Sequence, residues 1–234
     1  MATALIAGAS GLVGRCLLMQ LLDLPTYDCV VSVGRRRLDL EHPKLRQVVA
    51  DFEALDKLPE PLRGDDTYCC LGTTIRQAGS PEAFRAVDHA AVLAFAWAAQ
   101  RGGARCFSVV SSVGADPGAR AFYSRVKGET EDALRVLDFG SLGIFRPSLL
   151  LGQRTEARIG EKLGAGLLWL AEPFLVGRVR KYRAIQAEIV ARAMWRSAVG
   201  PLPRGVTLYE SNEIERLGHW AGGAGSEGSD TVKV

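Results

Sequence analysis

A glycine-rich turn near the start of the chain restricts the fold more strongly than any other feature of the sequence. The apolar run Thr3–Ala7 is followed by Gly-Ala-Ser-Gly-Leu-Val-Gly, and a helical pattern begins at the last of these glycines. Glycines in a strand-to-helix turn let the backbone approach a pyrophosphate, whose charge then faces the helix N-terminus. The sequence therefore predicts a dinucleotide-binding turn, with a tight turn that binds no ligand as the alternative. The expected contacts are Gly8, Ser10, Gly11, Leu12, Val13 and Gly14.

Short apolar runs alternate with helical patterns along the first half of the chain. The apolar runs lack the polar alternation of half-exposed strands, as expected for strands buried on both faces. Strands that alternate with helices predict an α/β fold with a doubly wound parallel sheet, the Rossmann arrangement. Ser80 and Pro81 are expected to open one long helix that runs to about Gln100. Further strands are expected at Cys29–Val33, Leu45–Ala50, Thr67–Leu71, Cys106–Val110, Leu142–Phe145 and Val206–Tyr209, and further helices at Gly14–Leu22, Ala121–Leu137 and Lys181–Ser197.

The length of 234 residues fits one α/β domain. We expect this domain to span residues 1–217, with a small C-terminal substrate lobe at 148–217, because the pattern becomes looser after Pro147. Residues 218–234 are rich in Gly, Ser and Asp, which predicts a disordered tail.

Charge and cysteine content narrow the class of protein further. The chain has 29 Lys+Arg and 26 Asp+Glu, and a net charge of +3 is too small to indicate nucleic acid. Its five cysteines form no C-x-x-C motif, so we expect no metal site, no disulfide framework and a cytoplasmic location. The N-terminus lacks a basic leader, and the longest uncharged runs are too short for an integral membrane segment. A small-molecule substrate is the expected partner, and a monomer or homodimer is the expected assembly.

The residues after the second predicted strand bear on the choice of dinucleotide. An acidic residue there would hold the ribose 2′-hydroxyl of NAD, but the sequence reads Gly34-Arg35-Arg36-Arg37. Arginines can instead bind a 2′-phosphate, so we expect a preference for NADP(H) over NAD(H), with Arg35 and Arg36 as contacts. A solvated basic turn is the alternative. Asp51 and Phe52, after the third strand, are further candidates near the adenine.

Tyr123 and Lys127 form a Y-x-x-x-K pattern on a predicted helix. Positions i and i+4 lie on one helical face, and a nearby ammonium favours the phenolate form of tyrosine. Such a tyrosine can act as a general acid/base in hydride chemistry. Ser111 or Ser112, at the end of the preceding strand, would donate a hydrogen bond to the substrate, and an ordinary surface pair is the alternative interpretation of Y-x-x-x-K. Asp88 and His89 are expected to be a helix polar residue and a packed or exposed histidine.

Together the strings GASGLVGR, GRR, DF, CCLGTT, SSVGAD, YSRVKGE and FRP resemble atypical short-chain dehydrogenases/reductases. More narrowly, the chain is similar to the Tat-interacting-protein oxidoreductase group of NAD(P)-binding Rossmann proteins over about residues 3–160. The resemblance implies that Ser10 to Val13 line the pyrophosphate, that Tyr123 is the proton donor and acceptor, and that Lys127 is its partner. It also implies cofactor contacts from the remaining candidates, which are Leu71, Gly72, Thr73, Arg146 and Arg158.

Two functions remain open at this point. The first is an NADP(H)-dependent oxidoreductase that transfers hydride to or from a small carbonyl or alcohol, with Tyr123 as acid/base. The second is an NADP(H)-binding redox sensor or scaffold with little or no turnover. The glycine turn supports both functions equally, whereas only the enzyme needs the pair of Tyr123 and Lys127.

Overall fold

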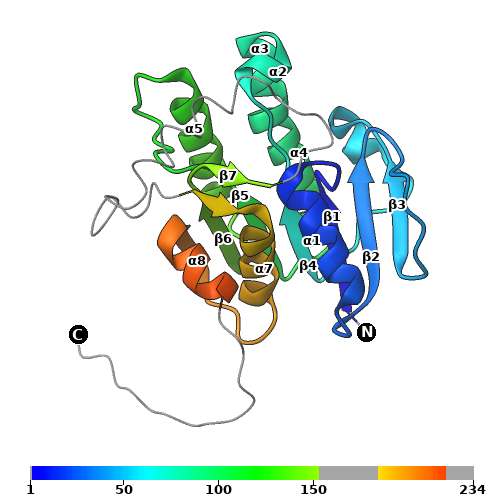
Figure 1. The fold of residues 1–234 in the computed structure, drawn as a ribbon. Helices are drawn as coiled ribbons and strands as arrows, with labels where there is room; N and C mark the ends of the chain where they lie inside the picture. Colours follow the sequence, from blue (N-terminus) through cyan, green and yellow to red (C-terminus); the bar gives the residue numbers. More distant parts are fainter. Residues whose placement is uncertain (1, 153–183, 220–234) are drawn as a thin grey trace.

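The structure, a computed structural model, describes residues 2–152 and 184–219, and its centre is a sheet of seven parallel strands (Figure 1). The order across the sheet is β3-β2-β1-β4-β5-β6-β9, and each neighbouring pair is parallel. This arrangement confirms the predicted doubly wound Rossmann fold. The strands are β1 (Ala2–Ala7), β2 (Tyr27–Gly34), β3 (Leu45–Val49), β4 (Asp66–Cys69), β5 (Cys106–Val110), β6 (Ser141–Arg146) and β9 (Gly205–Glu210).

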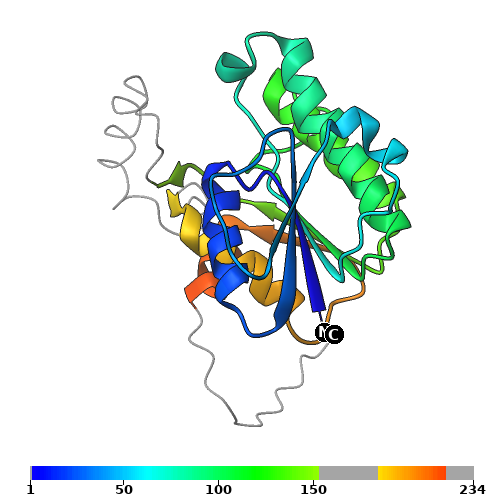
Figure 2. The ribbon, with the colours of Figure 1, turned by 90° about the vertical axis from the view of Figure 1, so that its right-hand side faces the viewer.

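Helices cover both faces of the sheet, which Figure 2 shows from its side. On one face α1 (Leu12–Asp23) packs beside α7 (Ala187–Ala198), and their apolar side chains share one core with residues of β1 and β2. On the other face α4 (Val92–Arg101) and α5 (Phe122–Val136) enclose the second core. Central strands such as β4 are buried at every position, as expected for strands that are covered on both faces of the sheet.

The predicted long helix is divided into three segments. It begins with α3 (Pro81–Arg85), where the Ser80 hydroxyl accepts a hydrogen bond of 3.1 Å from the Ala83 amide, as expected for an N-cap. A π-helical segment, η2 (Ala86–Ala91), follows and leads into α4. Wider π turns are rare and are frequently found at functional sites. The short helices η1 (Phe52–Lys57) and α2 (Ile75–Ala78) complete this half of the molecule.

The C-terminal part contributes to the main domain. β9 extends the sheet beside β6, and α7 packs against α1 and α8 (Ser211–His219), a helix that the sequence analysis did not anticipate. The strands β7 (Leu150–Leu151) and β8 (Ile185–Gln186) form a separate small sheet. A distinct substrate lobe at 148–217 stays a prediction. The expected tail comprises residues 218–234. Its first two residues form the end of α8, and residues 220–234 lie outside the described residues.

Two further properties concern the described residues only. None of their helices is long and apolar enough to cross a membrane. They also contain no group of His, Cys, Asp and Glu side chains placed to hold a metal ion, and the five cysteines are free.

Candidate functional site

The carboxyl ends of the parallel strands place the sequence candidates along one edge of the sheet (Figure 1). Ala7, at the end of β1, pairs with Val33 of β2 and with Cys69 of β4. The glycine turn, the arginines after Gly34 and the loop after β4 therefore leave the sheet side by side. The strand order reverses between β1 and β4, and ligands of doubly wound sheets bind in the crevice at such a switch point.

The glycine turn is built from close backbone contacts. Gly8 has a φ of +81°, and a Cβ at Gly8 would collide with the carbonyl of Cys70. A Cβ at Gly14 would likewise collide with the carbonyl of Gly8, so a larger residue at either position would displace the turn. Helix α1 begins after Gly11, which has no side chain to cap it, and its first turn contains no acidic residue. Backbone amides at this helix start suit a phosphate group, so the turn fits a dinucleotide.

The side chains of the turn differ in their access to the crevice. Ser10 and Gly11 are exposed and Leu12 is half-buried, whereas Val13 and Gly14 are buried in the first core. Val13 could therefore contact a cofactor only through its backbone. Leu12 packs against Gly152 at the end of β7, because a Cβ on Gly152 would lie 2.7 Å from Leu12 Cδ1.

The candidates after β2 and β3 have different surroundings. Arg35 and Arg36 are exposed and directly follow β2, next to the glycine turn. Asp51 caps η1, where its carboxylate accepts a hydrogen bond of 3.3 Å from the Glu53 amide. Phe52 is 6% exposed and packs edge-on against Phe95, in the second core. Asp51 and Phe52 thus have structural roles, and their contact with adenine stays a prediction.

The loop after β4 lies over a buried ion pair. The Asp88 carboxylate accepts a hydrogen bond of 2.8 Å from the Thr73 amide, and its other oxygen lies 2.8 Å from Lys127 Nζ. A Cβ built on Gly72 would be 3.4 Å from Asp88 Oδ1 and 3.6 Å from Lys127 Nζ. The structure therefore brings Lys127 directly beneath the loop that contains Leu71, Gly72 and Thr73.

Tyr123 and Lys127 lie one turn apart on α5. The Tyr123 ring is half-buried and packs against Phe84, with 5.4 Å between the ring centroids. Burial, the largest single influence, lowers the pKa of the Lys127 ammonium, but the charge and hydrogen bond of Asp88, together with Tyr123 and Cys69, outweigh it. The net pKa of Lys127 therefore lies above its ordinary value. Lys127 therefore holds its positive charge one helical turn from Tyr123, as expected of a partner for this tyrosine.

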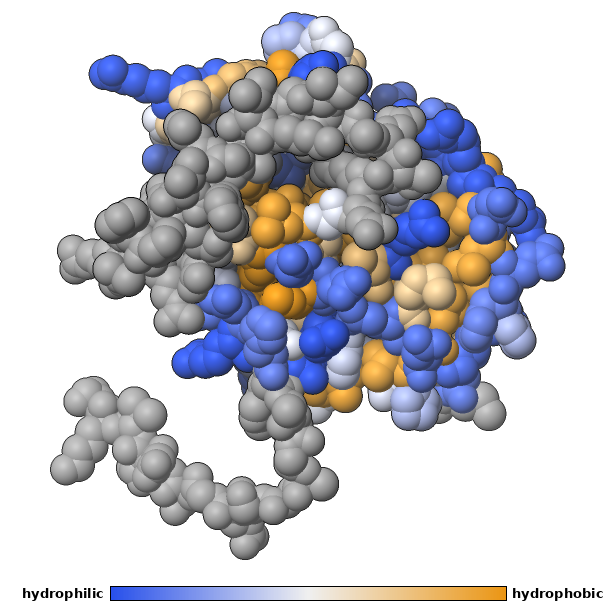
Figure 3. All heavy atoms as spheres, in the orientation of Figure 1, coloured by the Kyte–Doolittle hydropathy of each residue, from blue (hydrophilic) through white to orange (hydrophobic). Residues whose placement is uncertain are grey.

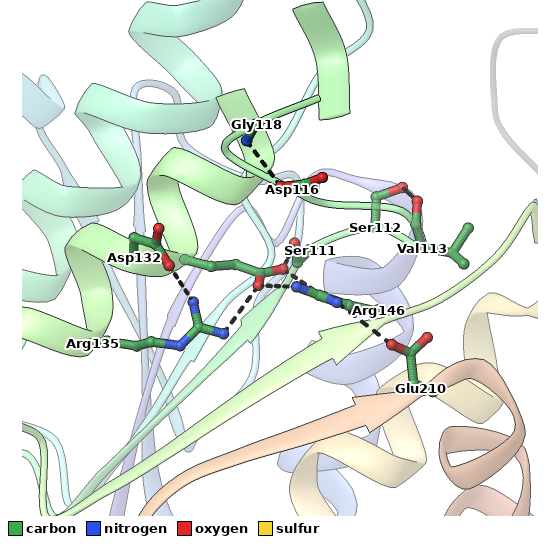
Figure 4. Close-up of polar contacts among 10 residues, drawn as sticks. Ser111, Ser112, Val113, Asp116, Gly118, Asp132, Arg135, Arg146 and Glu210 are labelled. Atoms are coloured by element: carbon green, nitrogen blue, oxygen red, sulfur yellow. Dashed lines mark hydrogen bonds and ion pairs between the residues drawn. The ribbon is translucent and has the colours of Figure 1, made fainter. Parts of the chain in front are cut away.

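A network of charged groups lies between α5 and the ends of the neighbouring strands (Figure 4). Glu131, also on α5, is 2% exposed and accepts a hydrogen bond of 2.5 Å from the Ser111 hydroxyl. Arg146 donates two hydrogen bonds to the same carboxylate, from Nε at 2.9 Å and from Nη2 at 2.6 Å. The third nitrogen of Arg146, Nη1, lies 3.5 Å from Oε1 of Glu210 on β9. The network joins α5 to the carboxyl ends of β5, β6 and β9.

This network engages the side chains of two candidates, Ser111 and Arg146. The Ser111 hydroxyl is engaged by Glu131, whereas Ser112 is partly exposed and donates only a hydrogen bond of 3.3 Å to the Val113 carbonyl. Arg146 is held by Glu131 and Glu210, so its expected contact with a cofactor stays untested. Arg158 lies outside the described residues.

Sequence reasoning missed Asp88 and Glu131 as parts of the site. Glu131 extends the pattern of Tyr123 and Lys127 by one more helical turn, so the spacing i, i+4, i+8 was a usable signal. Asp88 had no comparable signal, since its contact with α5 depends on tertiary packing. Its neighbour His89, expected to be a packed or an exposed histidine, is partly buried. Its Nδ1 lies 3.0 Å from the Thr130 hydroxyl, and burial together with Arg85 lowers its pKa.

Several apolar side chains are exposed around β7 and α2. Leu149 and Leu151 are 42% and 37% exposed, and hydrophobic residues gather over β7 in the space-filling view (Figure 3). Ile75, at the start of α2, is 39% exposed.

Comparison with known sequences identifies related proteins, although no protein-family model matches the chain. Protein HTATIP2 from Rattus norvegicus is 38% identical over 220 residues, which cover 91% of this chain and 88% of that protein. Protein FMP52, mitochondrial, from Coccidioides immitis is 32% identical over 242 residues, which cover 93% of this chain and 97% of that protein. These values show a relationship over nearly the whole length of both proteins.

Solved structures confirm the fold. MoeE5 in complex with UDP-glucose and NAD has a TM-score of 0.65 at 18% identity, covering 91% of this chain and 79% of that one. Human epimerase family protein SDR39U1 with NADPH has a TM-score of 0.60 at 18% identity, covering 89% and 74%. At such low identity the similarity establishes the Rossmann architecture alone.

The comparisons overturn one expectation. Several fungal relatives are named mitochondrial proteins, which contradicts the cytoplasmic location predicted for this chain. That prediction was wrong because it depended on free cysteines. Free thiols indicate a reducing environment, and they do not identify which compartment provides it.

Proposed function

The chain belongs to the HTATIP2 group of atypical short-chain dehydrogenases/reductases, and we propose that it is an NADP(H)-dependent oxidoreductase for a small carbonyl or alcohol substrate. One observation carries this proposal. The Lys127 ammonium lies beneath Gly72 at the edge of the sheet where a dinucleotide would bind, one helical turn from Tyr123 on α5. A glycine turn alone would equally suit a binding protein, whereas a buried cation beside a phenol suits proton transfer.

The cofactor would be held by parts of three loops. The amides at the start of α1 would bind the pyrophosphate, and the loop of Leu71, Gly72 and Thr73 would cover the ribose. Arg35 and Arg36 would bind the 2′-phosphate, since they are exposed directly after β2 and no acidic residue occupies that turn. When bound, the nicotinamide supplies or accepts the hydride.

The chain's own residues would manage the proton. Tyr123 donates a proton to the carbonyl oxygen during reduction, or removes one from the alcohol during oxidation. The Lys127 charge stabilises the phenolate form that results from donation. Ser112 orients the carbonyl through its hydroxyl, because the hydroxyl of Ser111 is engaged by Glu131.

Replacement of Tyr123 by Phe tests the enzymatic role. We expect turnover of a carbonyl panel, followed by NADPH oxidation, to fall by about a hundredfold or more, because the acid is lost. NADPH binding, followed by fluorescence, should remain within about threefold of wild type, because the ring and its packing on Phe84 are retained. Equal turnover by both proteins would refute the role of Tyr123.

Two measurements separate this proposal from the alternatives. Tight NADPH binding by wild type without turnover of any substrate would favour the sensor or scaffold function. NADH binding about tenfold tighter than NADPH binding would refute the assignment of Arg35 and Arg36.

A further inference from the structure

The ion pair of Asp88 and Lys127 is unusual in how completely it is buried. The side chain of Asp88 is 0% exposed and that of Lys127 is 7% exposed, with 2.8 Å between Oδ1 and Nζ. A buried charge is costly unless it is paired, and removal of one partner leaves the other without compensation. The reaction proposed above uses Lys127 and assigns no role to Asp88, so the presence of a buried carboxylate needs its own explanation.

The position of Asp88 is fixed from two directions. One carboxylate oxygen receives the amide of Thr73, and the other faces the ammonium of Lys127. Asp88 itself lies in the π-helical segment η2, which packs against α5. One side chain thereby links three elements: the loop after β4, η2 and the helix that carries Tyr123.

Gly72 separates this pair from the crevice. It has no side chain, and a Cβ there would lie 3.4 Å from Asp88 Oδ1 and 3.6 Å from Lys127 Nζ. Gly72 is itself exposed. A movement of Lys127 of even one side-chain rotamer would therefore change the charge presented next to a bound cofactor.

The groups around Lys127 decide whether it can stay charged. Tyr123 on α5 and Cys69 on β4 interact with it in addition to Asp88. Glu131 lines the same small cavity, but Arg146 already pairs with its carboxylate. Burial lowers the pKa of Lys127, and Asp88 contributes most to the opposing rise. The carboxylate that compensates the Lys127 charge is thus Asp88.

We propose that Asp88 is a positioning residue that anchors the Lys127 ammonium beneath Gly72 and keeps it charged at the pH at which the protein works. Without this carboxylate the buried amine loses its proton more readily. Tyr123 then lacks the positive charge that stabilises its phenolate. The inference rests on the proposed function for its catalytic consequence, but the charge state of Lys127 can be measured without substrate or cofactor.

Nuclear magnetic resonance of the full chain with ¹³C-labelled lysine provides that measurement. The chain has six lysines, and the Lys127 signal is the one missing from a Lys127→Met variant. In wild type we expect this signal to titrate above about pH 10.4, the ordinary value of lysine. In Asp88→Asn we expect its midpoint to fall by about two pH units. Glu129→Gln is the matched control: it removes a nearby carboxylate that pairs with Arg85, so the Lys127 midpoint should not move.

Stability and activity give independent readouts. In Asp88→Asn the folded state binds fewer protons at Lys127 than the unfolded state, so the loss of stability should shrink as pH rises towards about 10. Loss of a purely structural hydrogen bond would give a pH-independent deficit. Where wild type is active, kcat of Asp88→Asn should decline at alkaline pH at which wild-type kcat is constant.

The outcomes distinguish this inference from the proposed function. A Lys127 midpoint that is equal in wild type and Asp88→Asn overturns the inference, whatever the activity. If Asp88→Asn fails to fold, the wild-type titration still decides, since a midpoint below that of the other lysines overturns the inference. A shifted midpoint in a protein that turns over no substrate supports the role of Asp88 and refutes the proposed function.

Discussion

Replacement of Glu131 by Gln tests whether the buried carboxylate holds α5 on the sheet. Glutamine keeps the shape and one acceptor oxygen but removes the charge that Arg146 and Ser111 contact. Loss of one partner from a buried ion pair costs about 3–5 kcal/mol. Arg146 is 17% exposed and retains Glu210 at 3.5 Å, so we expect the lower end of this range, about 3 kcal/mol.

Urea unfolding followed by circular dichroism measures the change in the free energy of unfolding, and thermal unfolding measures the corresponding change in Tm. For a domain of this size, a loss of about 3 kcal/mol corresponds to a decrease in Tm of about 6–12 °C. Asp132→Asn is the matched control on the same helix, because Asp132 is 55% exposed and pairs with Arg135 at 2.7 Å. The control should change stability by less than about 1 kcal/mol, as exposed ion pairs contribute little. Equal losses in both variants would refute the view that the network anchors α5.

Two other predictions follow from the cofactor edge and the cysteines. Replacement of both Arg35 and Arg36 by Gln should weaken NADPH binding by about tenfold or more and leave NADH binding unchanged, because only NADPH offers a 2′-phosphate. Fluorescence titration measures both affinities. Equal weakening of NADPH and NADH binding would contradict the assignment of these arginines. Burial raises the pKa of Cys69 to about 12, and burial together with Asp66 raises that of Cys106 to about 12. At about pH 8 the thiols of Cys69 and Cys106 stay protonated, so they should resist iodoacetamide in the folded protein. All five cysteines should react after unfolding. Mass spectrometry that finds Cys69 or Cys106 modified in the folded protein would contradict their burial.

The sequence contains enough local information to place most of the fold. The strand Cys106–Val110 was predicted with its observed bounds, and Ser80 and Pro81 marked the start of α3 correctly. Local signals of this kind depend on neighbours in the chain, such as a cap or a continuous apolar run. Helix α8 lacked them, since it is mostly polar and is held by Ile214, which is buried against α7.

The site was predictable only where its residues share one element. Tyr123 and Lys127 were recognised because they lie one turn apart on a single helix. Asp88 comes from another part of the chain, and its pairing with Lys127 exists only after η2 packs on α5. Ser111 and Ser112 were both candidates for their place after β5. The Ser111 side chain turns towards Glu131, a direction that the backbone pattern does not reveal.

The π-helical segment imposes a constraint on chain length. Each residue of a helix advances around its axis, by about 100° in an α-helix and by less in a wider π turn, so deletion of one residue between Asp88 and α4 would rotate Asp88 away from its present direction. Its carboxylate would then leave the face that meets α5. Insertions and deletions should therefore be absent from relatives of this chain in the stretch between Asp88 and Val92.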